Sequence, residues 1–291
     1  MNRFASRPTV LLTVLLGLCA SSSVSQSDSN RPPGHTPVLL ITVDTLRADH
    51  LSCYGARNVR TPAMDALAAK GVRFENALAQ VPTTPPSHAV ILTGTYPVYN
   101  GVRDFSSGPL PQSVGVLAEA FERQGYDTAA FVSAFVLDST WGFSRGFETY
   151  DDHFDLRQLE TGNPGTIERR AEQTINLLLA WFRSRPATGT ARPFFVWLHL
   201  YDPHRPYTPP EPFRTEYASH LYDGEVAYAD SQLARLFAAL RRNGLYDRTL
   251  IVLLSDHGES LGEHGEDDHG FFIYNCHRGK PLVRPVRLEK V

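Results

Sequence analysis

Residues 83–94 (TTPPSHAVILTG) combine a hydroxyl side chain, two prolines and a short apolar helix pattern that stops at a glycine. Pro85 and Pro86 suit the first turn of a helix, because proline has a preset φ and its missing N–H costs little there. Ser87 can cap that turn. Thr84 would then lie at a helix N-terminus, where N–H groups and the helix dipole attract anions. A nucleophile held there could meet a phosphate or sulfate group; a plain proline-rich loop is the alternative interpretation.

Acids and histidines follow three apolar segments that are typical of strands buried on both faces of a parallel sheet. They are Asp44 after residues 38–43, His204 after residues 193–200, and Asp256 with His257 after residues 249–254. Because ligands of open α/β sheets gather at the carboxyl ends of the strands, we expect these side chains to converge. Each one alone has a structural interpretation as a cap or an ordinary histidine. Together with a hydroxyl at a helix N-terminus, they predict an active site.

The elements that must position these residues alternate between strand and helix. Strands are expected at residues 38–43, 72–80, 128–132, 193–200 and 249–254, and helices at residues 61–71, 113–124, 166–185 and 222–243. This alternation predicts an α/β fold, a layered sheet with helices on both faces. No internal repeat is present.

Composition agrees with one large globular domain. The chain has 291 residues, of which 42% are hydrophobic and 20% charged, and its net charge is −3. A weakly acidic chain of this kind gives no reason to expect a nucleic-acid partner. Its three cysteines are too few for a disulfide framework, and their spacing fits no zinc site.

The first 23 residues have the pattern of a signal peptide. Arg3 and Arg7 precede the apolar run 10–20, which is too short to span a bilayer, and small residues follow it. Residues 24–36 are rich in Ser, Asn, Pro and Gly and predict a linker. We therefore expect an exported protein, periplasmic or secreted; a lipoprotein anchored to the membrane through Cys19 is the alternative, which the bulky residue before that cysteine disfavours. A buried N-terminal helix is the structural alternative.

The polar segments resemble the sulfatase family, within the alkaline-phosphatase superfamily. The matching stretches are VLLITVDTLRADHLSCYG (38–55), TPAMDALAAKGVRFENA (61–77), PPSHAVILTGTYPVYNGVRD (85–104), HLYDPHRPY (199–207), YDGEVAYAD (222–230) and LLSDHGESLGEHGEDDHG (253–270). They follow the family's order and are specific for the superfamily, but much less so for the substrate. The resemblance implies an alkaline-phosphatase-like layered sheet and a metal-dependent ester hydrolase.

Site residues are carried over from their places in these motifs. The metal ligands that the resemblance implies are Asp44, Thr84, Asp256 and His257. Thr84 also falls on the nucleophile position, and His204 matches the histidine near the leaving group. His269 falls where sulfatases often have a substrate lysine, and where phosphoethanolamine transferases have a histidine. We expect His269 and His88 to hold the non-bridging oxygens of the substrate.

Several positions depart from the sulfatase pattern. Sulfatases carry Cys or Ser in a C-x-P-S-R motif, which is converted to formylglycine, whereas this chain has Thr84 there and His88 in place of the arginine. Thr45 replaces the second acid of the usual pair, and the lysine-bearing segment expected near residues 132–137 is absent. A hydrated aldehyde can expel sulfate by collapsing to a carbonyl, but a threonine ester cannot. A phosphothreonine can instead be hydrolysed by water attacking phosphorus, so phosphate esters or diesters are the favoured substrates.

The cofactor expected from these residues is a divalent metal ion. Two acids and one imidazole suit zinc better than calcium, which takes six or more oxygen ligands. Zinc is therefore the favoured ion, with manganese and calcium as alternatives. The expected partner is a small-molecule, glycan or lipid ester.

Three other functions stay open. An arylsulfatase-like sulfuric ester hydrolase is one, a phosphoethanolamine-type transferase is another, and a truncated non-catalytic relic is the third. Transferases of that type have several membrane helices before the catalytic domain, so hydrolysis is favoured.

The catalytic domain is expected at residues 37–275. Residues 276–291 are basic and broken by prolines where the family continues into a smaller C-terminal subdomain, so we expect that subdomain to be missing.

The leader generates a direct prediction. In a bacterial host the exported protein should begin between about Cys19 and Gln26, because small residues follow the apolar run there. N-terminal sequencing of the exported fraction checks this, and an exported protein that still begins at Met1 would contradict it.

Overall fold

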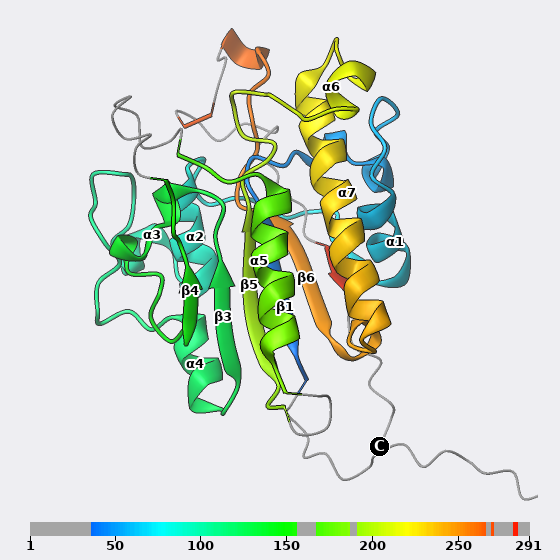
Figure 1. Cartoon of the computed structure of the whole chain (residues 1–291). Coiled ribbons are helices and arrows are strands. Elements are labelled where there is room, and N and C mark those ends of the chain that lie inside the picture. Colours follow the sequence, from blue (N-terminus) through cyan, green and yellow to red (C-terminus); the bar gives the residue numbers. More distant parts are fainter. Residues whose placement is uncertain (1–35, 156–166, 187–190, 266–268, 271–281, 285–291) are drawn as a thin grey trace, which may run out of the picture. The chain divides into compact units, whose positions relative to one another are not determined.

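The computed structural model describes residues 36–155, 167–186, 191–265, 269–270 and 282–284. The predicted signal peptide, Cys19 and most of the predicted linker lie outside these residues. Within the described residues, seven strands form one sheet in the order β2-β7-β6-β1-β5-β3-β4 (Figure 1). They are β1 (Val38–Val43), β2 (Val72–Arg73), β3 (Asp127–Phe131), β4 (Thr149–Asp151), β5 (Phe194–Leu200), β6 (Leu250–Ser255) and β7 (Leu282–Arg284). The predicted α/β fold is confirmed.

The strand β1 lies at the centre of five parallel strands. It pairs in parallel with β5 on one side and β6 on the other, and β3 and β4 extend the parallel part beyond β5. All five strands therefore end at the same edge of the sheet. Beyond β6, the strands β7 and β2 are each antiparallel to their neighbour.

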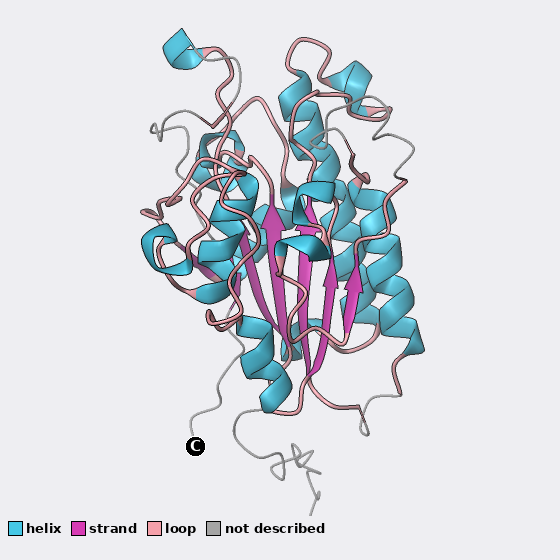
Figure 2. Ribbon diagram, turned by 90° about the vertical axis from the view of Figure 1, so that its left-hand side faces the viewer, coloured by secondary structure: helices cyan, strands magenta, loops and turns pink. Residues whose placement is uncertain are grey.

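Helices cover both faces of the sheet, as Figure 2 shows from the side. Alternate residues of β1 point to opposite faces. Leu39 and Ile41 belong to the core under α1 (Pro62–Lys70), α5 (Ala171–Ser184) and α7 (Leu221–Arg242), whereas Leu40 belongs to a second core. That second core lies under α2 (Thr84–Thr93) and α4 (Leu117–Arg123).

Short elements complete the described part of the chain. The remaining short helices are α3 (Pro97–Asn100) and α6 (Phe213–Glu216), and the 3-10 turns are η1 (Ala48–His50), η2 (Ser52–Tyr54), η3 (Phe135–Leu137), η4 (Ser139–Trp141), η7 (Tyr246–Arg248) and η8 (Glu263–Gly265). Within the described residues, no helix combines the length and the apolar character needed to cross a bilayer.

Some predicted elements differ from the structure. The strand expected at residues 72–80 is only two residues long, because the segment after Arg73 makes no ladder and its side chains are largely exposed. The helices expected from residues 113 and 166 begin later, at Leu117 and Ala171. Within the predicted tail 276–291, β7 adds a strand to the sheet between two prolines, which a proline-broken pattern did not suggest.

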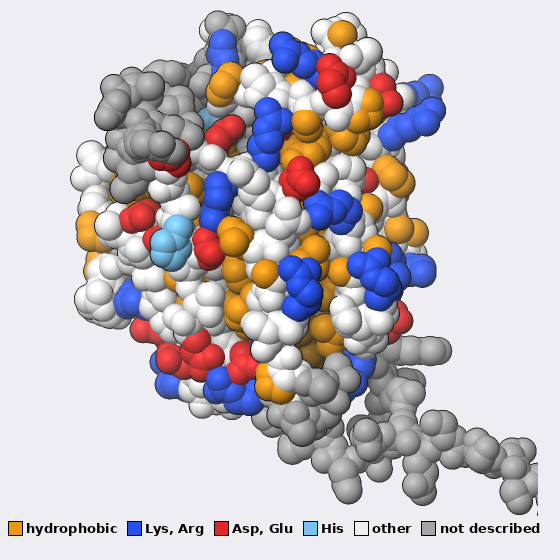
Figure 3. All heavy atoms as spheres, in the orientation of Figure 1, with side chains coloured by type: hydrophobic (Ala, Val, Ile, Leu, Met, Phe, Trp, Pro, Cys, Tyr) orange, Lys and Arg blue, Asp and Glu red, His pale blue; other side chains and the backbone are white. Residues whose placement is uncertain are grey.

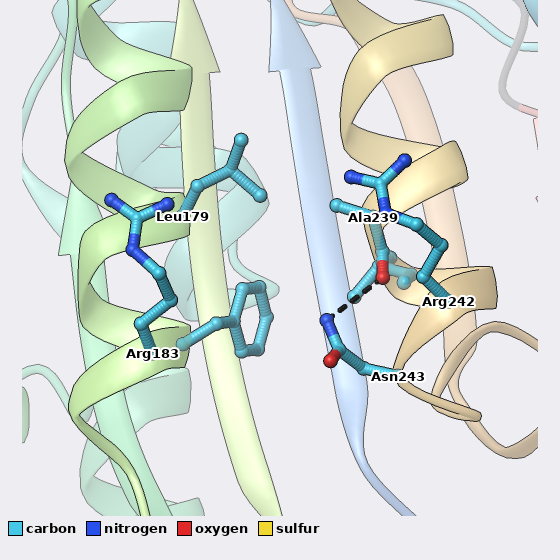
Figure 4. Close-up of a pocket in the computed structure, with 7 residues that line it drawn as sticks. Leu179, Arg183, Ala239, Arg242 and Asn243 are labelled. Atoms are coloured by element: carbon cyan, nitrogen blue, oxygen red, sulfur yellow. Dashed lines mark hydrogen bonds between the residues drawn. The ribbon is translucent and has the colours of Figure 1, made fainter.

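A cavity lies at the end of the molecule where the parallel strands begin, away from the edge at which they end. It has a volume of about 250 Å³ and lies between the C-terminal ends of α5 and α7, lined by Leu179 and Arg183 from one helix and Arg242 from the other (Figure 4). Asn243 donates to the carbonyl of Ala239 beside it, at 2.9 Å.

On the face shown in Figure 3, positive and negative side chains are interspersed rather than gathered by sign.

A buried carboxylate on α7 caps α1 from a distance. Asp230 accepts the backbone N–H groups of Ala63 and Met64, at 3.0 and 2.8 Å, in the first turn of α1. These groups have no partner inside their own helix. Asp230 therefore ties α1 to α7 on one face of the sheet.

Replacing this cap should destabilise the fold. Asp230→Ala should lower the free energy of unfolding by about 1–3 kcal/mol, because two buried N–H groups lose their acceptor. Asp230→Asn keeps one oxygen and should lose less. Denaturant unfolding of the three proteins measures the difference, and equal stability of Asp230→Ala and the wild type would contradict the assigned role.

Candidate metal and catalytic centre

Thr84 is the first residue of α2, as the sequence predicted. The preceding Thr83 has an extended backbone, and the chain turns into the helix through the two prolines. The Thr84 side chain is only 2% exposed, and its Oγ1 lies 3.4 Å from Nε2 of His257. Ser87 does not cap the helix as expected; its hydroxyl donates to the carbonyl of Asp256, at 2.6 Å, and so fastens α2 to the end of β6.

Asp44, Asp256 and His257 form one buried cluster at the ends of β1 and β6. Each offers a ligand atom, and these atoms all lie within 4.8 Å of one another. One oxygen of Asp256 accepts the backbone N–H groups of Thr45 and His257. Among the described residues, the other oxygen of Asp256 and Oδ1 of Asp44 have no hydrogen-bond donor. Two buried carboxylate oxygens thus face the same small space.

The imidazole of His257 presents a lone pair to that space. Its Nδ1 lies 3.0 Å from the carbonyl of Gly258, which can only accept, so in the neutral ring Nδ1 holds the proton. Nε2 then faces Asp256 Oδ2 at 3.3 Å and Asp44 Oδ1 at 3.8 Å as an acceptor. Three acceptors around one point are the donor set of a cation site.

Keeping both Asp44 and Asp256 ionised in this buried position is unfavourable unless a cation lies between them. Burial raises the pKa of Asp44 to about 7. Burial and the charge of Asp44 raise the pKa of Asp256 well above its ordinary value. Desolvating each carboxylate costs several kcal/mol, and the two also repel each other. A divalent ion bound between them would offset both effects, so the residues present fit the metal that the sequence predicted.

His199 supports Asp44 from β5, a role that the sequence analysis missed. The backbone N–H of Ser133 donates to Nδ1 of His199 at 3.3 Å, so the ring proton lies on Nε2, which donates to Oδ2 of Asp44 at 3.3 Å. Burial lowers the pKa of His199 to about 3, so the ring is neutral at physiological pH. Its position at the end of a predicted central strand was the signal that could have revealed it.

His204 and His269 lie next to the buried cluster and closer to solvent. The His269 ring lies 4.5 Å from that of His257 and 5.0 Å from that of His204, measured between centroids. Nδ1 of His269 donates to the buried carboxylate of Glu259, at 3.0 Å. The His204 ring stacks on Tyr201, and its Nδ1 contacts the carbonyl of Arg205, at 2.6 Å. Protonation of a leaving oxygen by His204 would use the other nitrogen, Nε2.

His88 lies beneath the cluster, inside the protein. It is fully buried, with Nδ1 2.8 Å from the carbonyl of Thr84 and Nε2 3.1 Å from the hydroxyl of Thr42 on β1. Burial lowers its pKa well below the ordinary value. Both ring nitrogens therefore meet protein atoms, and this position suits a residue that supports α2. The predicted contact of His88 with substrate stays a prediction.

Arg47 joins the loop after β1 to the loop after β6. Its guanidinium donates to both oxygens of Asp49, to Glu263 and to the carbonyl of Glu259. Thr45, in the same loop, has a φ of 53°, a left-handed conformation that is rare for a β-branched residue. Strain of this kind persists where surrounding contacts impose it, and it is common at functional sites.

This chain belongs to the sulfatase family, whose sequence model matches residues 36–280. Human iduronate 2-sulfatase is 25% identical to it over 339 aligned positions, which cover 87% of this chain and 60% of the relative. Human arylsulfatase A is 28% identical, with coverage of 84% and 55%. The chain thus spans about 60% of the length of such curated relatives.

Solved structures agree on the fold. The phosphonate monoester hydrolase of Agrobacterium radiobacter superposes with a TM-score of 0.71 at 23% identity, over 86% of this chain and 68% of that one. At this identity the likeness shows the alkaline-phosphatase-like fold and no more.

The cluster should bind a divalent ion and depend on both acids. Metal analysis of the protein loaded with zinc should find the ion in the wild type and little in Asp256→Asn, which keeps the shape but loses the charge. A chelator should lower the melting temperature of the wild type, because an ion at 100 times its Kd adds about 2.7 kcal/mol of stability.

Asp104→Asn is the matched control, since Asp104 is an exposed carboxylate outside the cluster. It should keep the metal content and the chelator response of the wild type. Equal metal content in Asp256→Asn and the wild type would remove Asp256 from the site.

Proposed function

We propose that this chain is a metal-dependent hydrolase of phosphate or sulfate esters, with phosphate esters or diesters favoured. One observation carries the proposal: the Thr84 hydroxyl lies 3.4 Å from His257, at a helix N-terminus and against the Asp44–Asp256–His257 cluster. A hydroxyl in this place can attack a phosphorus or sulfur atom whose negative oxygens point toward the helix start.

The proposed reaction has two displacements. Thr84 Oγ1 releases its proton to solvent and forms a bond to phosphorus while the bond to the leaving oxygen breaks in line. His204 donates a proton to that oxygen, which is typically worth about 10²–10⁴-fold in rate. Water then attacks phosphorus and gives a proton to the now neutral His204, while the Thr84 oxygen departs and takes a proton from solvent to regenerate the hydroxyl.

The divalent ion would be held by Asp44, Asp256 and His257, with Thr84 beside it. When bound, it would lower the pKa of the Thr84 hydroxyl and offset charge on the transferred group. His269, held by Glu259 on one nitrogen, is placed next to His257, where a non-bridging oxygen of the substrate would lie. Zinc is the ion that this donor set favours.

Sulfate ester hydrolysis is the second candidate. It is supported by the names of curated relatives, which include iduronate 2-sulfatase and an N-acetylglucosamine-6-O-sulfatase of Bacteroides thetaiotaomicron, 26% identical over 70% of this chain and 37% of the relative. These names also support a glycan ester among the substrates. Threonine in the nucleophile position argues for phosphorus, because a threonine ester has no aldehyde route for releasing sulfate. Export, through the predicted signal peptide, is part of the same proposal.

The substrate preference can be tested with matched 4-nitrophenyl esters. The protein loaded with zinc should hydrolyse the phosphate monoester or a phosphate or phosphonate diester with a higher kcat/KM than the sulfate ester. Thr84→Ala should lose at least about 10³-fold in kcat, since the covalent route is closed, and should still bind metal through the other ligands.

Four results would each contradict a different part of the proposal. A higher kcat/KM for the sulfate ester would make the chain a sulfatase that works without formylglycine. Wild-type activity in Thr84→Ala would remove the covalent intermediate altogether. Transfer to an added alcohol in preference to water would favour the transferase alternative, and no turnover of any ester by the metal-loaded chain would favour the non-catalytic one.

A further inference from the structure

A cavity of about 460 Å³ lies beside the candidate centre, within the size range of small-molecule sites. It is bordered by η1, the loop after β5, the start of α7 and the loop that follows Glu259. The polar residues that line it are His50, Arg205, Tyr207, His220, Tyr222 and Asp223. None of them was singled out as catalytic or metal-binding from the sequence.

The walls of this cavity continue directly from the loops that carry the centre. Arg205 follows His204 in the chain, and its carbonyl contacts the His204 ring. The Tyr222 hydroxyl donates to the carbonyl of Thr45, the residue after Asp44, at 2.8 Å. A leaving group that His204 protonates would therefore extend toward this cavity.

The polar lining contains one arginine and one carboxylate, and the two differ in exposure. Asp223 is its one carboxylate among the described residues, and it is 3% exposed and already paired: its Oδ1 lies 2.5 Å from Nδ1 of His50. Arg205 adds a permanent positive charge at the exposed rim.

Aromatic rings give the cavity an apolar side as well. Tyr207 and Tyr222 meet edge to face, with centroids 5.5 Å apart, and Leu221 and Leu261 lie near them. Such a combination can hold the carbon skeleton of a ligand against the rings while the Arg205 guanidinium receives a charged substituent.

We propose that this cavity binds the leaving group of the substrate and selects leaving groups that carry a second anionic group, received by Arg205. This proposal rests on the function proposed above. The ester that reacts would occupy the metal centre, and the second anion, a carboxylate or a further acidic ester, would occupy the cavity.

Paired substrates test this selectivity. Each pair consists of two aryl esters that differ only at the end of a short alkyl spacer on the ring, a carboxylate in one and a carboxamide in the other, with spacers of one to four methylenes. For at least one spacer length, the wild type should prefer the carboxylate by about tenfold or more in kcat/KM, as expected for charge-assisted hydrogen bonds. Arg205→Gln should reduce this preference to about threefold or less.

Arg214→Gln is the matched control, because Arg214 is an exposed arginine on the nearby α6 that does not line the cavity. It should keep the wild-type preference. Equal kcat/KM for the two members of every pair, or an equal loss of preference in Arg214→Gln and Arg205→Gln, would overturn the proposal while leaving the hydrolase assignment intact.

If the protein hydrolyses none of these esters, the role of the cavity can still be tested by measuring ligand binding. Calorimetry with the corresponding phenols, which lack the ester, should then show tighter binding of the carboxylate than of the carboxamide, again by about tenfold. Equal binding would overturn the cavity's role, whereas the absence of turnover alone would count against the proposed function.

Discussion

The repulsion between two buried carboxylates is the constraint on which this structure depends. Asp44 and Asp256 are both fully enclosed, each has an oxygen with no donor among the described residues, and those oxygens face the lone pair of His257. Hydrogen bonds from His199 and from two backbone N–H groups fix the outer oxygens and leave the inner ones facing the same space as Nε2 of His257. A divalent ion resolves the repulsion, and the same ion would place positive charge beside Thr84.

The fold meets this constraint by bringing three adjacent strand ends together. β1 lies between β5 and β6, so Asp44, His199 and Asp256 reach one edge of the sheet from neighbouring strands. The strained backbone of Thr45 directs its N–H to Asp256. Arg47 then fastens the loop after β1 to the loop after β6. These contacts hold together the two loops that carry Asp44 and Asp256.

The sequence predicted the architecture because its central strands β1 and β5 are almost wholly buried, and because prolines at the start and glycines at the end mark α1 and α2. It also predicted the cluster of Asp44, Asp256 and His257, since strand-end acids converge in parallel sheets. His199 and Arg47 were missed because their roles depend on which strands are neighbours. The spacing of apolar residues predicts where strands lie in the sequence but not their order in the sheet. The burial of His88 was missed for the same reason: α2 presses that ring onto β1 and β5, a contact between segments far apart in the chain.

Anomalous scattering from crystals of the zinc-loaded protein tests the central claim most directly. The account predicts one strong peak at the zinc edge about 2.0–2.2 Å from an oxygen of Asp44, an oxygen of Asp256 and Nε2 of His257, the usual distances for this ion. Thr84 Oγ1 should be the next protein atom toward it. No peak at this position, or a peak that lies elsewhere while the two acids remain protonated and paired with each other, would contradict the account.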